Sequence, residues 1–182
     1  TTQGETLSTP AHLSQTTASL AVANQLENAY NKGDWAFETF GSAIFGDSKG
    51  EIYAAHASIG YFFLDNFSVN FQPFIGGFSG NPDDGAVVGF DLIARYYLIQ
   101  ENDWSFFVEG GGGLQEAFSQ SFPSNGSHFN FRPQAGAGIT YQFENLRVLA
   151  GARYIHISNA GVRSKNPDYN AAMVYGGVEI PF

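Results

Sequence analysis

The chain has 182 residues and a formal net charge of −9, which argues against a nucleic-acid partner because the phosphates of nucleic acid would be repelled. It contains no cysteine, so a disulfide framework and a thiolate site are both excluded. Aromatic residues make up 16% of the chain and charged residues only 14%, a low charged fraction for a soluble domain of this size.

Residues 1–33 differ in composition from the rest of the chain. They are rich in Thr, Ser, Ala and Gln and nearly free of aromatic residues, which predicts a mobile arm or linker. The alternative is an arm that docks on a neighbouring copy and builds a homo-oligomer; residues 19–30 could then form a short helix or strand. No signal peptide is visible at Thr1, so for an exported protein of the outer membrane we expect the signal peptide to have been removed already.

From residue 34 onward, apolar and polar residues alternate, which is typical of β-strands. No apolar run approaches the roughly 18 residues of a membrane-spanning helix, whereas tilted β-strands can cross a bilayer with about 9–11 residues. The connections alternate between tight turns and longer loops, as they do in outer-membrane barrels. We predict eight strands, over residues 34–46, 50–63, 66–80, 85–99, 102–116, 128–143, 145–158 and 170–182.

The two faces of these predicted strands differ in polarity. The apolar face carries aromatic residues near strand ends, as an interfacial girdle requires, and the polar face carries glycines and charges of both signs that can pair in a narrow lumen. The pattern predicts an all-β, eight-stranded antiparallel transmembrane β-barrel with a polar lumen over residues 34–182. A soluble barrel with the apolar face inside is a weaker alternative. The charged residues assigned to the lumen are Glu38, Asp91, Arg95, Glu109, Arg132, Arg147, Arg153 and Glu179.

The segment RYIHISNAGV (153–162) carries the candidate chemistry. Arg153 marks the luminal face, so strand alternation directs His156 and Ser158 outward, at a strand end that leads into a long loop. A histidine can take the proton of a serine hydroxyl while the hydroxyl attacks an ester carbonyl. The spacing His-x-Ser is a weak signal by itself, and two polar residues at the membrane interface are the alternative.

Neighbouring residues can complete such a site. Asn170 opens the last predicted strand on the outward face, where it can orient the imidazole of His156 across the strand pair. Asn159 and the backbone N–H groups of Ala160 and Gly161 lie next to the serine and can hold an oxyanion.

Other histidines have structural interpretations. His56 and Ser58 repeat the His-x-Ser spacing, but their face is predicted to be luminal. His128 stands at a strand start after a long loop and is predicted to be solvated. No His, Asp or Glu cluster has the spacing of metal ligands, so we expect neither a metal nor a cofactor.

The segment YIHISNAGVRSKNPDYN (154–170) resembles the signature of the PagL-like outer-membrane lipid A 3-O-deacylases. That family carries His-x-Ser-Asn-Ala on a strand, a loop with an Asn-Pro or similar turn, and then the final strand. The resemblance is specific over about 154–182 and extends as barrel architecture over 34–182. It implies a serine esterase, a hydrolase of the bacterial outer membrane that is surrounded by membrane lipids and acts on the lipid A part of lipopolysaccharide. On this pattern His156 is the base and Ser158 the nucleophile.

One position departs from the family pattern. The family carries a glutamate fourteen residues after the histidine, and this chain carries Asn170 there. An asparagine can fix the imidazole tautomer but cannot stabilise the imidazolium by charge. Asp168 is the nearest carboxylate and is the alternative acid. An active enzyme, a slow enzyme and a silent barrel that assembles through its arm are the three alternatives; the acyl-chain preference and the oligomeric state are not readable from the sequence.

Overall fold

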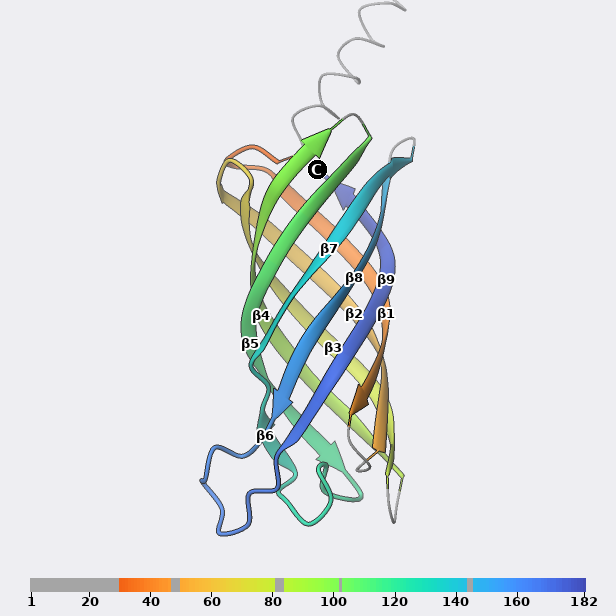
Figure 1. Ribbon diagram of the computed structural model, residues 1–182, viewed down its shortest axis with the longest axis vertical. Helices are drawn as coiled ribbons and strands as arrows, with labels where there is room; N and C mark the ends of the chain where they lie inside the picture. The colour runs from red at the N-terminus through yellow and green to blue at the C-terminus, as the bar shows by residue number, and fades with distance from the viewer. Residues whose placement is uncertain (1–29, 47–49, 81–83, 102, 144–145) are drawn as a thin grey trace, which may run out of the picture.

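The protein is a closed antiparallel β-barrel (Figure 1). The computed structural model describes residues 30–46, 50–80, 84–101, 103–143 and 146–182. Strands that follow one another along the chain pair, except that β6 and β7 both pair with β5, and β1 also pairs with β9, which closes the barrel. The strands are β1 (Trp35–Gly46), β2 (Gly50–Leu64), β3 (Phe67–Gly80), β4 (Gly85–Glu101), β5 (Trp104–Phe118), β6 (Phe129–Phe131), β7 (Gln134–Phe143), β8 (Leu146–Ile157) and β9 (Tyr169–Pro181).

The predicted eight-stranded barrel is confirmed, with one difference. The strand expected over 128–143 is interrupted at Arg132 and Pro133, and its two pieces, β6 and β7, both pair with β5. Proline has no N–H to donate to a strand ladder, which accounts for the break at this position. The described part of the chain contains no helix that is long and apolar enough to cross a membrane.

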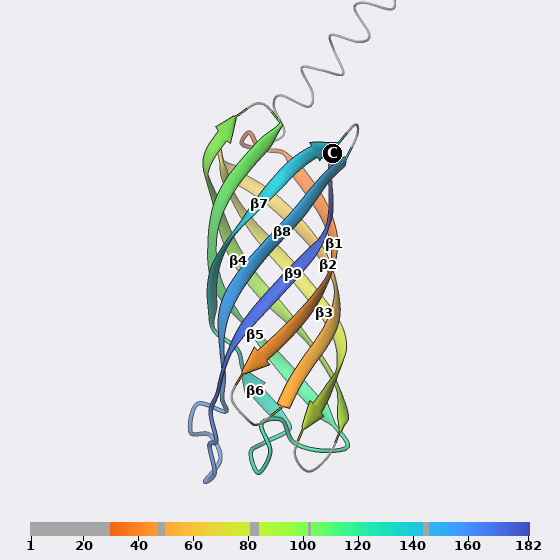
Figure 2. The same ribbon diagram turned by 45° about the vertical axis from the view of Figure 1, so that its right-hand side comes forward.

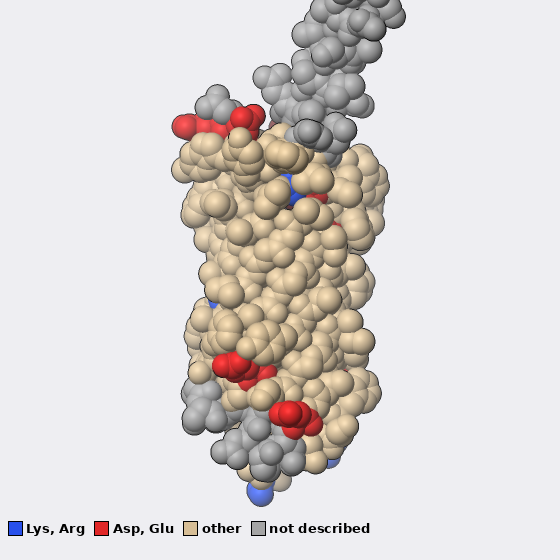
Figure 3. All heavy atoms as spheres, turned by 90° about the vertical axis from the view of Figure 1, so that its right-hand side faces the viewer, with Lys and Arg blue, Asp and Glu red and all other residues tan. Residues whose placement is uncertain are grey.

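The outer wall of the barrel is apolar. Large side chains such as Ile75, Leu92 and Ile139 point outward and are at least half exposed. Figure 3 shows one side of this wall nearly free of charged atoms between the two ends of the barrel. A continuous exposed apolar band is what lipid contact requires, and it contradicts the alternative of a soluble barrel with an apolar interior.

The lumen is filled by polar side chains that pair with one another. Arg95 and Arg153 both donate to the carboxylate of Glu109, at Nε–Oε distances of 3.1 and 2.6 Å. Arg147 contacts Glu179 at 2.8 Å in the same interior. All eight charged residues that the alternation assigns to the lumen are buried, so the predicted polar lumen is confirmed.

The two ends of the barrel differ. Figures 1 and 2 show the strands inclined to the long axis, with the β5–β6 and β8–β9 loops together at the end opposite the C-terminus, called here the loop end. At the other end, the Tyr30 hydroxyl lies 2.9 Å from Thr140 Oγ1 and Arg147 stacks on the Tyr30 ring. Tyr30 therefore packs among the luminal side chains at this end. Residues 1–29, which make up most of the predicted N-terminal arm, including most of 19–30, lie outside the described residues.

Candidate active site

The candidate residues lie on two paired strands. His156 of β8 stands directly opposite Asn170 of β9 in the antiparallel register. Ile155 and Ile157 flank His156 on β8, and both point into the lumen with no exposed surface. Because alternate side chains of a strand point to opposite faces, His156 and Asn170 share the outer face, and neighbours in such a pair are close enough to contact.

A hydrogen-bonded chain joins Ser158, His156 and Asn170. The Oγ of Ser158 lies 3.1 Å from Nε2 of His156, and Nδ1 of His156 lies 2.8 Å from Oδ1 of Asn170. An amide oxygen can only accept, so Nδ1 is the donor and Nε2 is left as an acceptor for the serine O–H. This is the tautomer that a general base next to a serine needs.

The amide of Asn170 is itself held in this orientation. Its Nδ2 donates to Oδ2 of Asp168 at 3.1 Å, and its Oδ1 accepts from the Tyr154 hydroxyl at 2.6 Å. A carboxylate can only accept, so Asp168 selects the amide rotamer that turns Oδ1 towards His156. Asp168, the alternative acid of the sequence analysis, is thus a neighbour of Asn170 and touches the imidazole chain through it.

Ser158 is placed by the short strand β6. It follows the last residue of β8 and exchanges backbone hydrogen bonds with Phe131, at 2.8 Å from Phe131 N to Ser158 O and 3.1 Å in the other direction. The N–H of His156 donates to the carbonyl of Pro133 at 3.0 Å. The break at Pro133 therefore lets β6 and β7 both hold the strand end, and Ser158 is only 7% exposed.

The residues after the serine form a tight turn. Asn159 is 2% exposed; its Oδ1 accepts from the N–H of Gly161, and its Nδ2 donates to the carbonyl of Lys165. Ala160 and Gly161 have φ values of 53° and 78°, in the left-handed region. Within the part of the chain that the structure describes, the N–H of Gly161 is used inside this turn and that of Ala160 has no hydrogen-bond partner.

The second His-x-Ser sequence has a different environment. His56 is buried in the lumen, where its Nε2 lies 2.9 Å from Ser42 Oγ and its ring stacks on Phe40. Ser58 contacts Gln72 instead of the histidine. The prediction that this pair faces the lumen is confirmed.

Comparison with known proteins identifies the family. The family profile described as "Lipid A 3-O-deacylase (PagL)" matches residues 14–179. The chain belongs to the PagL family. The match confirms the resemblance that was based on the segment 154–170. The matched region begins at residue 14, within the N-terminal segment 1–33 whose composition differs from the rest. No curated protein sequence matches the chain significantly.

Solved structures show the same barrel fold. The crystal structure of the outer membrane enzyme PagL is 20% identical, with a TM-score of 0.62, over 80% of this chain and 99% of that chain. The N-terminal β-barrel domain of Pseudomonas aeruginosa OprF is 22% identical, with a TM-score of 0.58, over 83% and 98%. Neisserial surface protein A is 15% identical, with a TM-score of 0.59, over 82% and 96%. With its PagL-family membership, the chain is a bacterial outer-membrane barrel.

Two contacts of this PagL-family site were not predicted from the sequence. Tyr154 shares the outward face of His156, so alternation places it near the site, but only the strand register brings its hydroxyl to Asn170. The bridge from Phe131 to Ser158 depends on the strand break at Pro133, and no short motif signals it.

Removing the Asp168 carboxylate tests how the imidazole chain is held. We expect Asp168→Ala to lower kcat by about 10- to 100-fold, because the Asn170 amide can then rotate and present Nδ2 to His156, which selects the wrong tautomer. Asn170→Glu in the Asp168→Ala background should restore kcat, since a carboxylate accepts from Nδ1 with either oxygen. Steady-state hydrolysis of an ester substrate measures both; an Asp168→Ala variant with the parent kcat would contradict this role.

Proposed function

We propose that the chain is an outer-membrane serine esterase that removes the ester-linked acyl chain at the 3 position of lipid A. The observation that carries the proposal is the hydrogen-bonded chain from Ser158 through His156 to Asn170 on the lipid-facing side of the barrel. Membership of the PagL family supports lipid A as the substrate.

The geometry suits acyl transfer through serine. Ser158 Oγ attacks the ester carbonyl while Nε2 of His156 takes the hydroxyl proton. The N–H of Ala160, which has no hydrogen-bond partner among the described residues, stabilises the tetrahedral oxyanion. Collapse breaks the bond to the sugar oxygen, which receives the proton from His156, and an acyl-serine remains. Water then attacks the acyl-serine with His156 as base, which releases the fatty acid and regenerates Ser158.

Asn170 has a positioning role in this mechanism. It holds Nδ1 of His156 as the donor, but as a neutral amide it does not stabilise the imidazolium by charge. The carboxylate of Asp168 accepts a hydrogen bond from the Asn170 amide and so polarises that amide towards the imidazole of His156. Activity is therefore expected with Asn170 in place.

The surroundings of Ser158 suit a substrate that stays in the membrane. Phe129, Phe131 and Tyr154 lie on the outer face next to the site and are each more than a third exposed. Acyl chains of a lipid can pack against these rings, while the ester linkage lies at the polar loop end. A lipid substrate therefore does not have to leave the leaflet to react.

Mass spectrometry of lipid A tests this function directly. We expect the purified barrel, in detergent or in vesicles, to remove one hydroxyacyl chain from lipid A that carries a 3-O-acyl group. Lipid A that already lacks this chain is the control and should keep its mass, because it has no ester at the 3 position left to cleave. An unchanged mass for the first substrate, or loss of a different chain, would contradict the proposal.

A further inference from the structure

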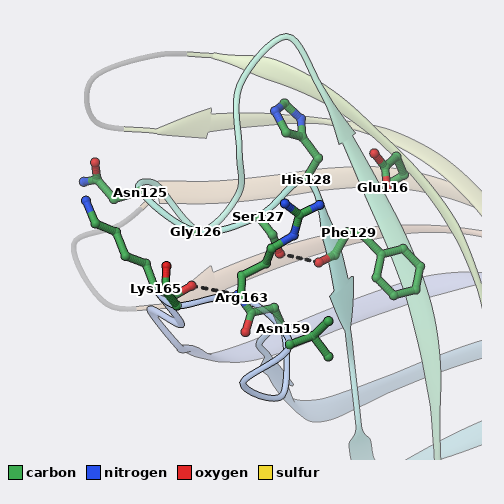
Figure 4. Close-up of a pocket in the computed structure, with 11 residues that line it drawn as sticks. Glu116, Asn125, Gly126, Ser127, His128, Phe129, Asn159, Arg163 and Lys165 are labelled. Carbon is green, nitrogen blue, oxygen red and sulfur yellow. Dashed lines mark hydrogen bonds between the residues drawn. The ribbon is translucent and has the colours of Figure 1, made fainter.

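A pocket lies at the loop end of the barrel, and Asn159, which follows the candidate nucleophile in the chain, lines it (Figure 4). The pocket lies between the β5–β6 loop (residues 119–128) and the β8–β9 loop (residues 158–168), opens to the surface, and has a volume of about 660 Å³. This is within the range of pockets that hold small molecules, roughly 300–1,000 Å³. Asn159, the residue after Ser158 in the chain, lines the pocket, so the pocket lies at the same strand end as the serine.

Two cationic side chains, Arg163 and Lys165, line this pocket. Figure 4 shows Arg163 extending towards Ser127 and His128, and Lys165 towards Asn125, so both side chains face the β5–β6 loop. Both are exposed, and neither forms an ion pair with any residue that the structure describes.

The placement of these cations contrasts with that of the other arginines. Arg95, Arg132, Arg147 and Arg153 are buried in the lumen within reach of carboxylates. In a chain with a net charge of −9, the cations at the pocket are thus available for an anion from outside the protein.

The mixture of groups favours an anionic sugar over an acyl chain. An arginine guanidinium matches a phosphate through two parallel hydrogen bonds, and a lysine adds a compact positive charge. Glu116 also lines the pocket, and its carboxylate can accept from sugar hydroxyls. A fatty acyl chain would leave these three charged groups without partners.

We propose that Arg163 and Lys165 bind a phosphate group on the sugar headgroup of the glycolipid substrate. The proposal rests on the proposed function and deepens it, because it says how the headgroup is held. A phosphate in the pocket anchors the sugar beside Asn159, which leaves its ester within reach of Ser158 and its acyl chains along the apolar wall. The phosphate then orients the substrate without taking part in the chemical step.

Binding measurements with an uncleaved substrate test this proposal. The Ser158→Ala protein serves as the parent, and native mass spectrometry measures its affinity for phosphorylated lipid A and for the same lipid A after both phosphates are removed. We expect the parent to bind the phosphorylated form at least about tenfold more tightly. Adding Arg163→Ala and Lys165→Ala should abolish this preference, so that the variant binds both forms equally.

Lys32→Ala in the same background is the matched control, because it removes a cation at the opposite end of the barrel, and it should keep the preference. Retention of the preference in the Arg163→Ala/Lys165→Ala protein would overturn the proposal, and so would its absence in the parent.

Inorganic phosphate is the third probe. Displacement of lipid A by inorganic phosphate at equal concentration would assign the site to free phosphate instead of a lipid headgroup. Heat-modifiable migration on gels shows that each variant is a folded barrel.

The two proposals fail in different ways. Binding of phosphorylated lipid A does not require hydrolysis. A wild-type protein that is inactive but prefers the phosphorylated form would therefore refute the esterase proposal and support the phosphate-binding proposal. A protein that releases the hydroxyacyl chain but binds both forms of lipid A equally would support the esterase proposal and refute the phosphate-binding proposal.

Discussion

Replacing Ser158 with alanine is expected to lower the release of hydroxyacyl chains from lipid A by about 10⁴-fold or more. The nucleophile of a serine triad acts as one unit with its base, so removing either member leaves only the contribution of binding and of the oxyanion donors. Mass spectrometry of the released fatty acid over time gives the rate for the wild type and for Ser158→Ala.

Ser58→Ala is the matched control for this experiment. Ser58 stands in the same His-x-Ser spacing, but it is buried in the lumen, where it contacts Gln72. Its replacement should leave hydrolysis near the wild-type rate. Equal rates for Ser158→Ala and the wild type, or equal losses in the two variants, would exclude Ser158 as the nucleophile.

Replacing Glu109 with alanine is expected to destabilise the barrel by about 3–5 kcal/mol. Glu109 accepts hydrogen bonds from Arg95, Arg153 and Tyr175, and all four side chains are buried in the lumen. In the variant, Arg153 loses its acidic partner and Arg95 loses one of its acidic partners. A buried charge without a partner raises the free energy of the folded barrel. Urea unfolding in vesicles, followed by tryptophan fluorescence, measures the loss.

Glu101→Ala supplies the comparison for Glu109→Ala. Glu101 is exposed at the end of β4, so its removal should change the free energy of unfolding by no more than about 0.5 kcal/mol. If Glu109→Ala unfolds at the same urea concentration as the wild type, the luminal network does not stabilise the barrel in the way described.

Much of the fold could be predicted from the sequence because a β-strand has a side-chain period of two. That period assigns every residue of a strand to one face, so the buried Arg153 and the outward His156 follow from their spacing alone. The interruption at Pro133 was not predicted, because the alternation continues across it: Asn130, Arg132 and Gln134 all point inward. The missing N–H of proline changes hydrogen bonding without changing the face.

The sequence by itself determined the barrel, the direction of each face and the pairing of a histidine with a serine two residues away, because these depend on neighbours along one strand. The tertiary structure decided the rest. Strand register brings the Tyr154 hydroxyl to Asn170 and Phe131 to Ser158, and it sets the expected pair His156 and Asn170 directly opposite each other. Register depends on how whole strands are staggered around the closed barrel, and local periodicity carries no information about that stagger. The same holds for the cationic pocket, whose two loops meet because β7 pairs with both β5 and β8.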